Sequence, residues 1–566
     1  MPDWLQRLTT SLLERALPGM PPATHRYEVR RDLAVPMSDG VELLGDLFLP
    51  VEPAGSTAPT MLIRSPYGRT GLSTLLFARP FAERGFPVFV QSCRGTFGSG
   101  GVFTPMVNER EDGIDTVRWV REQPWCTGRL VTAGPSYLGF TQWAAAGYLQ
   151  RDDPAAAPDA LSLLVTMPDF GEFTWDNGAF GLRTALGWTQ MVSAQERRGS
   201  VLRQVLGRRA LRRGYDRLPA NEADKLATGH TVHWYQDWLA HDSLADDYWR
   251  GQSHTAAVPA VTAPVSMITG WYDIFLPWQL RSYRALVEAG NPPQLTVGPW
   301  GHASPGLHRA APAETIAFLR HHLMGEPNTR EYPVHVYVTG AELWRDLPVW
   351  PPADAVEHDW LLGAGGRLVP PGGELPDPSG GPSRYTYDPA DPTPAVGGPS
   401  LETGYLPGDN AEHERRPDVL TFTSPILREA VEVVGEPVAT VSLGSNLEHT
   451  DLFVRLCDVH PDGRSMTVCD GIRRLGGRGT RDTDPVPDAE GVREVEVALW
   501  PTAHRFLPGH RLRLQVSSGA HPRYLRNPGG GEPPATARRL HRAHQEVHHD
   551  AGHRSRIALP TTSGRE

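Results

Sequence analysis

The segment spanning residues 130–148 constrains the fold of this chain more than any other. The apolar run 130–133 predicts a short buried strand, and the alanine-rich stretch 140–148 predicts a helix. The residues between them are Gly134-Pro135-Ser136-Tyr137-Leu138-Gly139. A serine at the apex of a tight strand–turn–helix connection flanked by glycines is typical of a nucleophile elbow. The second glycine comes one residue later than in the generic G-x-S-x-G pattern, so the turn alone leaves an ordinary β-α connection equally open.

Strand and helix patterns alternate on both sides of this segment. The predicted helices span 72–84, 112–122, 278–289 and 313–324, and the apolar strand-like runs span 27–50 (as a hairpin turning at 38–40), 60–63, 86–90, 265–269, 294–297 and 334–338. This alternation predicts an α/β class with a mostly parallel sheet that is covered on both faces.

A chain of 566 residues is too long for one core, so we expect several domains. Strand patterns fade after residue 150, where helical and aromatic-rich segments such as 180–197 and 201–213 dominate. Residues 351–399 are dense in proline and glycine and are interpreted as a loop or linker. Alternating segments without a long helix follow, which predicts a second, all-β sandwich domain. The expected boundaries are 25–149 and 260–352 for the α/β domain, 150–259 for a helical insertion and 353–566 for the β-sandwich.

The composition excludes some classes of function and indicates the cellular compartment. The net charge is −10, which argues against a nucleic-acid binder because such proteins carry a basic face. Four scattered cysteines without metal-ligand spacing predict reduced thiols and a cytoplasmic protein. No apolar run reaches the length of a membrane span. Residues 1–18 are amphipathic and predict a docking helix, with a membrane-surface helix as the alternative. The sequence leaves a homo-oligomer open.

Three residues follow predicted elements in the order nucleophile, acid, base. Ser136 lies at the elbow, Asp273 follows the strand 265–269, and His302 follows the strand 294–297. Imidazole activates a serine hydroxyl, and a buried carboxylate fixes the imidazole tautomer. Singly, each residue has an ordinary structural explanation, but together and in this chain order they predict a catalytic triad of an α/β-hydrolase.

These motifs resemble one enzyme family over nearly the whole chain. Gly134-Pro135-Ser136-Tyr137-Leu138-Gly139, Gly270-Trp271-Tyr272-Asp273 and Gly298-Pro299-Trp300-Gly301-His302 are similar to those of cocaine esterase, X-prolyl dipeptidyl aminopeptidases and α-amino acid ester hydrolases. The late glycine is that family's own form of the elbow. The resemblance implies an α/β-hydrolase domain, an inserted helical cap and a C-terminal jelly-roll domain. It further implies an oxyanion hole made by the Tyr67 hydroxyl and the backbone N–H of Tyr137.

At two places the sequence departs from the family's pattern, which limits the family properties that can be expected of this chain. Family members often carry Gln-Asp before the Arg-Gly of the glycine-rich loop, where this chain has Gln91-Ser92-Cys93-Arg94-Gly95, so a carboxylate that could order the loop is missing. Amino-ester hydrolases also carry a carboxylate pair shortly after the triad aspartate, to hold the substrate ammonium. Here residues 274–278 are apolar, which argues against a requirement for a free α-amino group and therefore against dipeptidyl-peptidase activity.

The sequence predicts a serine hydrolase of carboxylic esters, with amides as further substrates, that works through an acyl-enzyme. A pocket for a bulky apolar or aromatic acyl group is expected from Trp175, Trp188, Phe275 and Trp278. The alternatives are an X-prolyl dipeptidyl-peptidase, an acyltransferase and a non-catalytic ligand-binding protein. No cofactor is expected. The histidine-rich end is assigned to the terminal strand of the family rather than to a metal site; its histidines are His541, His544, His548, His549 and His553.

Overall fold

The computed structural model describes residues 14–15, 17–51, 58–70, 77–196, 200–374, 381–401, 407–480 and 483–562. Most of the predicted N-terminal helix and the first part of the helix predicted at 72–84 lie outside these ranges. The chain forms two compact units. Unit 1 comprises Met1–Phe170 and Arg250–His335, and unit 2 comprises Gly171–Trp249 and Val336–Glu566. Each unit is formed by two separate segments of the chain.

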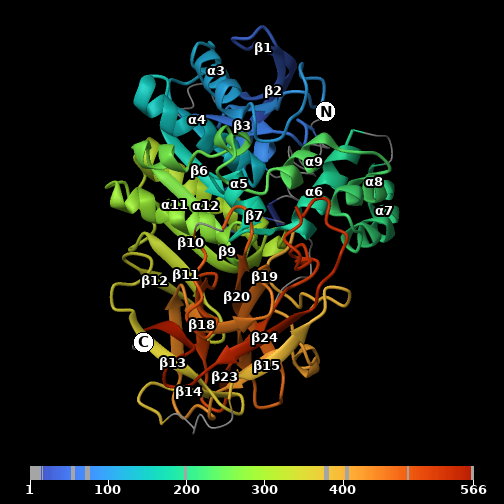
Figure 1. Ribbon diagram of the computed structural model, residues 1–566. Coiled ribbons are helices and arrows are strands. Elements are labelled where there is room, and N and C mark those ends of the chain that lie inside the picture. The colour runs from blue at the N-terminus through green and yellow to red at the C-terminus, as the bar shows by residue number, and fades with distance from the viewer. Residues whose placement is uncertain are drawn as a thin grey trace. The chain divides into compact units, whose positions relative to one another are not determined.

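Unit 1 is organised around a mostly parallel sheet, as the sequence predicts (Figure 1). Its strand order is β1-β2-β4-β3-β5-β6-β9-β10, and β11 follows at the boundary of the unit. The pairs β1–β2 and β2–β4 are antiparallel, and the strands from β4 to β10 run parallel. The strand bounds are β1 Arg26–Pro36, β2 Glu42–Val51, β3 Thr60–Ser65, β4 Val88–Ser92, β5 Leu130–Pro135, β6 Ala160–Leu164, β9 Val265–Tyr272, β10 Gln294–Gly301 and β11 Val334–Val338.

Helices cover both faces of this sheet. On one face, α3 (Glu109–Arg121) and α4 (Tyr137–Asp152) pack on Leu62 of β3 and its neighbours. On the other face, α12 (Pro305–Met324) lies over the adjacent side chains of β3 and over β6 and β9. Successive side chains of a strand point to opposite faces, so one apolar strand can serve both layers. The remaining helices of unit 1 include α2 (Arg79–Ala82) and α11 (Leu276–Glu288).

Unit 2 contains the inserted helices and an all-β region, each of the predicted type. The helices include α5 (Phe170–Thr174), α6 (Leu182–Ala194), α7 (Ser200–Tyr215), α8 (Ala223–Thr228), α9 (His233–Ala240) and α10 (Asp247–Arg250). The insertion begins later than predicted, since β6 at 160–164 pairs with β5 and β9 in the sheet of unit 1. The apolar run 160–164 is too short for its periodicity to separate strand from helix, and its two partner strands decide the outcome.

The all-β region forms one large sheet whose strands share a large apolar core. Its strands are β13 Val356–Gly363, β14 Arg367–Val369, β15 Ser383–Tyr387, β16 Leu420–Thr423, β17 Val431–Gly435, β18 Val438–Ser445, β19 Thr450–Val459, β20 Ser465–Leu475, β21 Val492–Ala498, β22 Thr502–Phe506, β23 Arg511–Ser517, β24 Ala543–His548 and β25 Arg556–Thr562. The interpretation of 351–399 as a linker is wrong, because β13 pairs with β25 and β15 pairs with β24. Those partners lie far along the chain, so the local proline and glycine content conceals the strands.

Within the described ranges, no helix combines the length and the apolar character that a membrane crossing needs.

The buried His254 in unit 1 makes the stability of the protein sensitive to mild acid. Its side chain is 1% exposed, and its Nδ1 lies 3.2 Å from the Tyr148 hydroxyl. Burial, aided by the charge of Arg110, lowers the pKa of His254 to about 4. The unfolded chain therefore binds this proton more readily than the folded chain does, and the stability present above about pH 6.5 is lost as the pH falls towards 4.

We expect the His254→Phe variant to lose less stability than the wild type between pH 7 and pH 4.5. The full contribution of such a shift is up to about 3 kcal/mol of unfolding free energy. Thermal unfolding at the two pH values measures the difference. The exposed His230→Phe variant is the control and should keep the wild-type pH dependence. An unchanged pH dependence in His254→Phe would contradict the assignment.

Candidate active site

Ser136 occupies a strained turn between β5 and α4. Its backbone angles are φ 59° and ψ −125°, an uncommon conformation for a residue with a side chain. A Cβ atom at Gly139 would lie 2.5 Å from Cβ of Thr166, and one at Gly134 would lie 2.5 Å from Cβ of Leu138. Both glycines are therefore required by close approach. The second glycine, Gly139, comes one residue late in the pattern, and this places it at the point where α4 packs closely against Thr166.

Hydrogen bonds tie the backbone of Ser136 to the neighbouring strand. Its N–H donates to the carbonyl of Leu164 at 2.9 Å, and its own carbonyl accepts the Thr166 hydroxyl at 2.8 Å. The N–H of Thr166 in turn donates to Oε1 of Gln279 on α11 at 2.9 Å. Both the N–H and the carbonyl of Ser136 are thus bonded to residues at the end of β6, which maintains the strained conformation of the turn.

Asp273 and His302 are in direct contact. Oδ2 of Asp273 lies 2.7 Å from Nδ1 of His302, and Oδ1 accepts the N–H of Phe275 at 2.8 Å. The carboxylate is fully buried, whereas the side chain of His302 is 12% exposed. A carboxylate accepts hydrogen bonds, so Nδ1 carries the proton and Nε2 of a neutral His302 remains able to accept one.

The sheet places Ser136 on the same edge as this pair. Ser136, Asp273 and His302 directly follow the carboxyl ends of β5, β9 and β10. These strands and β6 are parallel neighbours, so their carboxyl ends meet along one edge. In open α/β sheets this edge is where ligands bind. An activated serine hydroxyl at this edge suits acyl transfer.

The two tyrosines predicted for the oxyanion hole are neighbours. Tyr67 follows β3, the strand beside β5, and its ring meets the ring of Tyr137 edge-on, with centroids 6.4 Å apart. The Tyr137 hydroxyl donates to Oε1 of Glu109 at 2.8 Å and accepts the N–H of Met106 at 2.9 Å. Burial and the nearby Glu109 raise the pKa of Tyr137 well above its usual range, so its phenol stays protonated. The Tyr137 side chain is therefore engaged in the interior, while its amide lies in the first turn of α4, where helix N–H groups favour anions.

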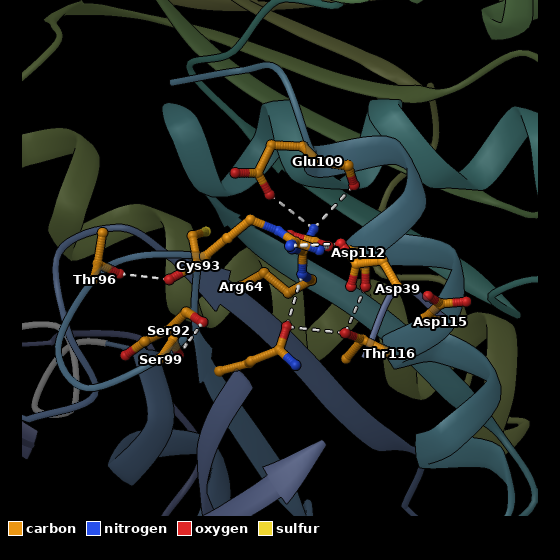
Figure 2. Close-up of polar contacts among 12 residues, drawn as sticks. Asp39, Arg64, Ser92, Cys93, Thr96, Ser99, Glu109, Asp112, Asp115 and Thr116 are labelled. Atoms are coloured by element: carbon orange, nitrogen blue, oxygen red, sulfur yellow. Dashed lines mark hydrogen bonds and ion pairs between the residues drawn. The ribbon is translucent and has the colours of Figure 1, made fainter. Parts of the chain in front are cut away.

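Sequence reasoning missed Glu109, which links Tyr137 to a buried arginine. Figure 2 shows the contact of Glu109 with this arginine, Arg64. Nη1 of Arg64 lies 2.9 Å from Oε2 of Glu109, and both side chains are 3% exposed. Nε of Arg64 donates to Oε1 of Gln91 at 2.8 Å. Glu109 lies three residues before the helix predicted at 112–122 and carries no pattern of its own, although it is the first residue of α3. Only the fold brings Glu109 into contact with Tyr137, the residue after Ser136.

The glycine-rich loop after β4 is ordered without the missing carboxylate (Figure 2). The Ser99 hydroxyl donates to the carbonyl of Ser92 at 2.9 Å, and the Thr96 hydroxyl donates to the carbonyl of Cys93 at 2.8 Å. Two bonds join Arg94 to the carboxylate of Asp112, at 3.1 and 2.5 Å. Hydroxyl groups and an arginine thus supply the restraint that a carboxylate at position 92 would give.

The four aromatic residues predicted for the acyl pocket divide between the two units. Phe275 and Trp278 are in unit 1, and the ring of Phe275 meets that of His302 edge-on, with centroids 5.3 Å apart. Trp175 and Trp188 are in unit 2. The indole N–H of Trp175 donates to the carbonyl of Trp238 at 3.0 Å, and the ring of Trp188 lies 5.8 Å from that of Trp238. The structure therefore brings Phe275 directly against a predicted catalytic residue.

Comparison with known proteins identifies relatives over almost the whole chain. Residues 39–304 match the X-Pro dipeptidyl-peptidase (S15) family, and residues 327–558 match the X-Pro dipeptidyl-peptidase C-terminal non-catalytic domain. Cocaine esterase of Rhodococcus sp. (strain MB1 Bresler) is 31% identical, and the alignment covers 94% of this chain and 98% of that protein.

Solved structures share the complete architecture. An α-amino acid ester hydrolase superimposes with a TM-score of 0.76 at 25% identity, covering 94% of this chain and 96% of that one. An aminopeptidase from a marine sediment archaeon, Thaumarchaeota archaeon, gives a TM-score of 0.78 at 24% identity and covers 95% of this chain and 97% of that one. These matches confirm the α/β-hydrolase domain with a C-terminal all-β domain.

Proposed function

Because the chain belongs to the S15 hydrolase family that includes cocaine esterase, we propose that it is a serine esterase with Ser136, His302 and Asp273 as its catalytic triad. The observation that carries the proposal is the 2.7 Å contact between Asp273 and His302, at the same sheet edge as the strained Ser136 turn. A surface histidine or a turn aspartate with no catalytic role would not require this arrangement.

The proposed reaction proceeds through an acyl-enzyme. Nε2 of His302 takes the proton of the Ser136 hydroxyl as Oγ attacks the ester carbonyl carbon. Asp273 stabilises the imidazolium. When the tetrahedral intermediate collapses, its bond to the alkoxy oxygen breaks, and His302 returns the proton to the leaving alcohol. Water, deprotonated by His302, then attacks the acyl carbon, which releases the acid and regenerates Ser136.

Two donors would stabilise the oxyanion, namely the hydroxyl of Tyr67 and the backbone N–H of Tyr137. The arrangement of their rings and the anchoring of Tyr137 by Glu109 support this assignment. Such donors act most strongly when they are already oriented before charge develops. The interior network around Glu109 would therefore act as a positioning element for the amide of Tyr137.

The Tyr67→Phe variant should hydrolyse esters about 10²-fold more slowly, since one oxyanion donor contributes about 3 kcal/mol. We expect the loss in kcat rather than in KM, because the donor acts on charge that develops in the transition state. Steady-state kinetics with a p-nitrophenyl ester measures both constants. The exposed Tyr332→Phe variant in the same unit is the control. A Tyr67→Phe enzyme with wild-type kcat would remove Tyr67 from the oxyanion hole.

We propose that the acyl group is bulky and apolar or aromatic. Phe275 lies against His302, and residues 274–278, Ile-Phe-Leu-Pro-Trp, contain no carboxylate for a substrate ammonium. Trp278, Trp175 and Trp188 remain proposed pocket residues. The family takes its name from the cleavage of X-Pro dipeptides. That reaction would instead need polar groups that bind the N-terminus of the peptide.

A substrate panel tests the proposal. It consists of p-nitrophenyl esters of increasing acyl size, a benzoyl ester, an aminoacyl ester and an Ala-Pro p-nitroanilide. We expect the highest kcat/KM for a bulky or aromatic acyl group. Preference for the anilide would favour the dipeptidyl-peptidase, and preference for the aminoacyl ester would overturn the apolar pocket. Rapid acylation with slow release to water, accelerated by added alcohols, would favour an acyltransferase. No turnover and no labelling by a fluorophosphonate would favour a ligand-binding protein.

A further inference from the structure

The turn between β24 and β25 brings two histidines and an aspartate together in unit 2. His548 ends β24, and Asp550 and His553 lie in the turn that follows. Nδ1 of His548 is 3.8 Å from Oδ2 of Asp550, and Nδ1 of His553 is 3.6 Å from Oδ1 of the same carboxylate. One ligand atom from each residue lies within 4.8 Å of the others. Neighbouring ligands of a tetrahedral zinc ion are about 3.3 Å apart, so small side-chain movements would complete a site.

The second nitrogen of each imidazole faces another carboxylate. Nε2 of His553 is 2.8 Å from Oδ2 of Asp488, and Nε2 of His548 is 3.5 Å from Oε2 of Glu546. Histidines that bind metals regularly donate their other N–H to a carboxylate, which fixes the tautomer and raises the basicity of the ligating nitrogen. His553 makes this hydrogen bond to Asp488, whereas Nε2 of His548 only approaches Glu546 and makes no hydrogen bond. With the rings in this orientation, both Nδ1 atoms face Asp550.

A second histidine–aspartate cluster in the same unit, Asp458 with His460 and His510, is held more tightly by its own hydrogen bonds. There, Oδ1 of Asp458 lies 2.8 Å from Nδ1 of His510, and Oδ2 lies 3.2 Å from Nε2 of His504. Both contacts are hydrogen bonds, so imidazoles already occupy this carboxylate, although Nε2 of His460 lies 3.8 Å from Oδ2 of Asp458. Around Asp550 the imidazole nitrogens are farther away, and Oδ1 accepts the N–H groups of Gly552 and His553 at 2.8 and 3.0 Å. Those bonds orient the carboxylate.

We propose that His548, Asp550 and His553 form a binding site for a transition-metal ion of the zinc class. Two imidazoles and a carboxylate favour zinc, cobalt or nickel over calcium and magnesium, which prefer all-oxygen sites. Oε2 of Glu490, which lies 3.8 Å from Nδ1 of His553, is placed to approach as a fourth ligand. The proposal replaces the expectation from the sequence that the histidine-rich end holds no metal. It is independent of the proposed esterase activity.

The site borders a groove of about 640 Å³ on the all-β region. His548, Glu546 and Glu490 are among the residues that line it. Water or an oxygen of a ligand in this groove could take the fourth coordination position in place of Glu490.

Zinc titration of the metal-free, full-length protein by isothermal calorimetry tests the proposal. We expect one ion per chain, and we expect affinity to fall at least about 100-fold in His553→Ala because one direct ligand is lost. Asp488→Asn should weaken binding by about 10-fold while leaving the three ligands in place, because it changes the carboxylate that contacts Nε2 of His553. Cobalt loading should give the visible absorption of a tetrahedral site in the wild type and lose it in His553→Ala.

His544→Ala is the matched control, since this exposed histidine lies on the same strand outside the cluster. It should bind zinc as the wild type does, and so should Ser136→Ala, which separates this proposal from the catalytic one. Thermal unfolding verifies that the variants are folded. The proposal fails if the wild type binds no zinc, if calcium displaces the zinc, or if His553→Ala and His544→Ala bind it equally.

Discussion

Ester hydrolysis by the Ser136→Ala variant is expected to fall by about 10⁵-fold or more in kcat, because removing a serine nucleophile from a triad abolishes the acyl-enzyme route. The remaining activity would come from substrate binding and the oxyanion donors alone. Substrate affinity should change little, since alanine removes one oxygen atom at the elbow. Steady-state kinetics with the best ester of the panel and labelling by a fluorophosphonate measure the two consequences.

A matched control for this substitution is Ser282→Ala. The Ser282 hydroxyl donates to the carbonyl of Trp278 within α11, so its loss leaves the sheet edge unchanged. Wild-type activity in this control together with full activity in Ser136→Ala would identify another nucleophile. Equal losses in both variants would point to a general effect on folding, which thermal unfolding would reveal.

Replacing Asp273 with asparagine should lower kcat by about 10⁴-fold while leaving the fold intact. Oδ1 of Asp273 accepts the N–H of Phe275, so the asparagine oxygen is expected to keep that position and to direct its NH₂ group at Nδ1 of His302. Nδ1 must then accept, and the proton of neutral His302 moves to Nε2. An imidazole in that tautomer cannot take the proton of Ser136.

Asp115→Asn provides the corresponding control. Oδ2 of Asp115 accepts the N–H of Ser38 at 2.8 Å in the same unit, so this variant exchanges one hydrogen-bonded carboxylate for an amide away from the triad. The expected result is wild-type kcat. A decrease in Asp273→Asn that appears only in KM would contradict the tautomer argument, because it would indicate lost substrate binding instead of lost proton transfer.

Local sequence patterns predicted the layers of unit 1 and the residues proposed as the triad at one edge of its sheet. The apolar runs 130–133, 265–269 and 294–297 could be recognised because a buried parallel strand is short, continuous and followed by a turn. The carboxyl ends of such strands meet at one edge, so the chain order of Ser136, Asp273 and His302 already carried spatial information. Glu109 had no comparable signal, since its role depends on a contact between two helices and an arginine of β3.

The linker interpretation of 351–399 failed for a related reason. The strands β13 and β15 are specified by pairing with β25 and β24, whose positions a local window cannot contain. β-propensity depends strongly on such neighbours, so proline and glycine near a strand outweigh its own signal in sequence.

The sequence by itself determined the fold class, the serine elbow with its flanking glycines and the order of the predicted triad, because each depends on residues close together in the chain or on the regular geometry of parallel strands. Only the tertiary structure decided the contact of Asp273 with His302, the anchoring of Tyr137 by Glu109 and the meeting of Asp488 with His553. These contacts join side chains that are distant in sequence, and their distances follow from how strands and helices pack, which no local pattern encodes.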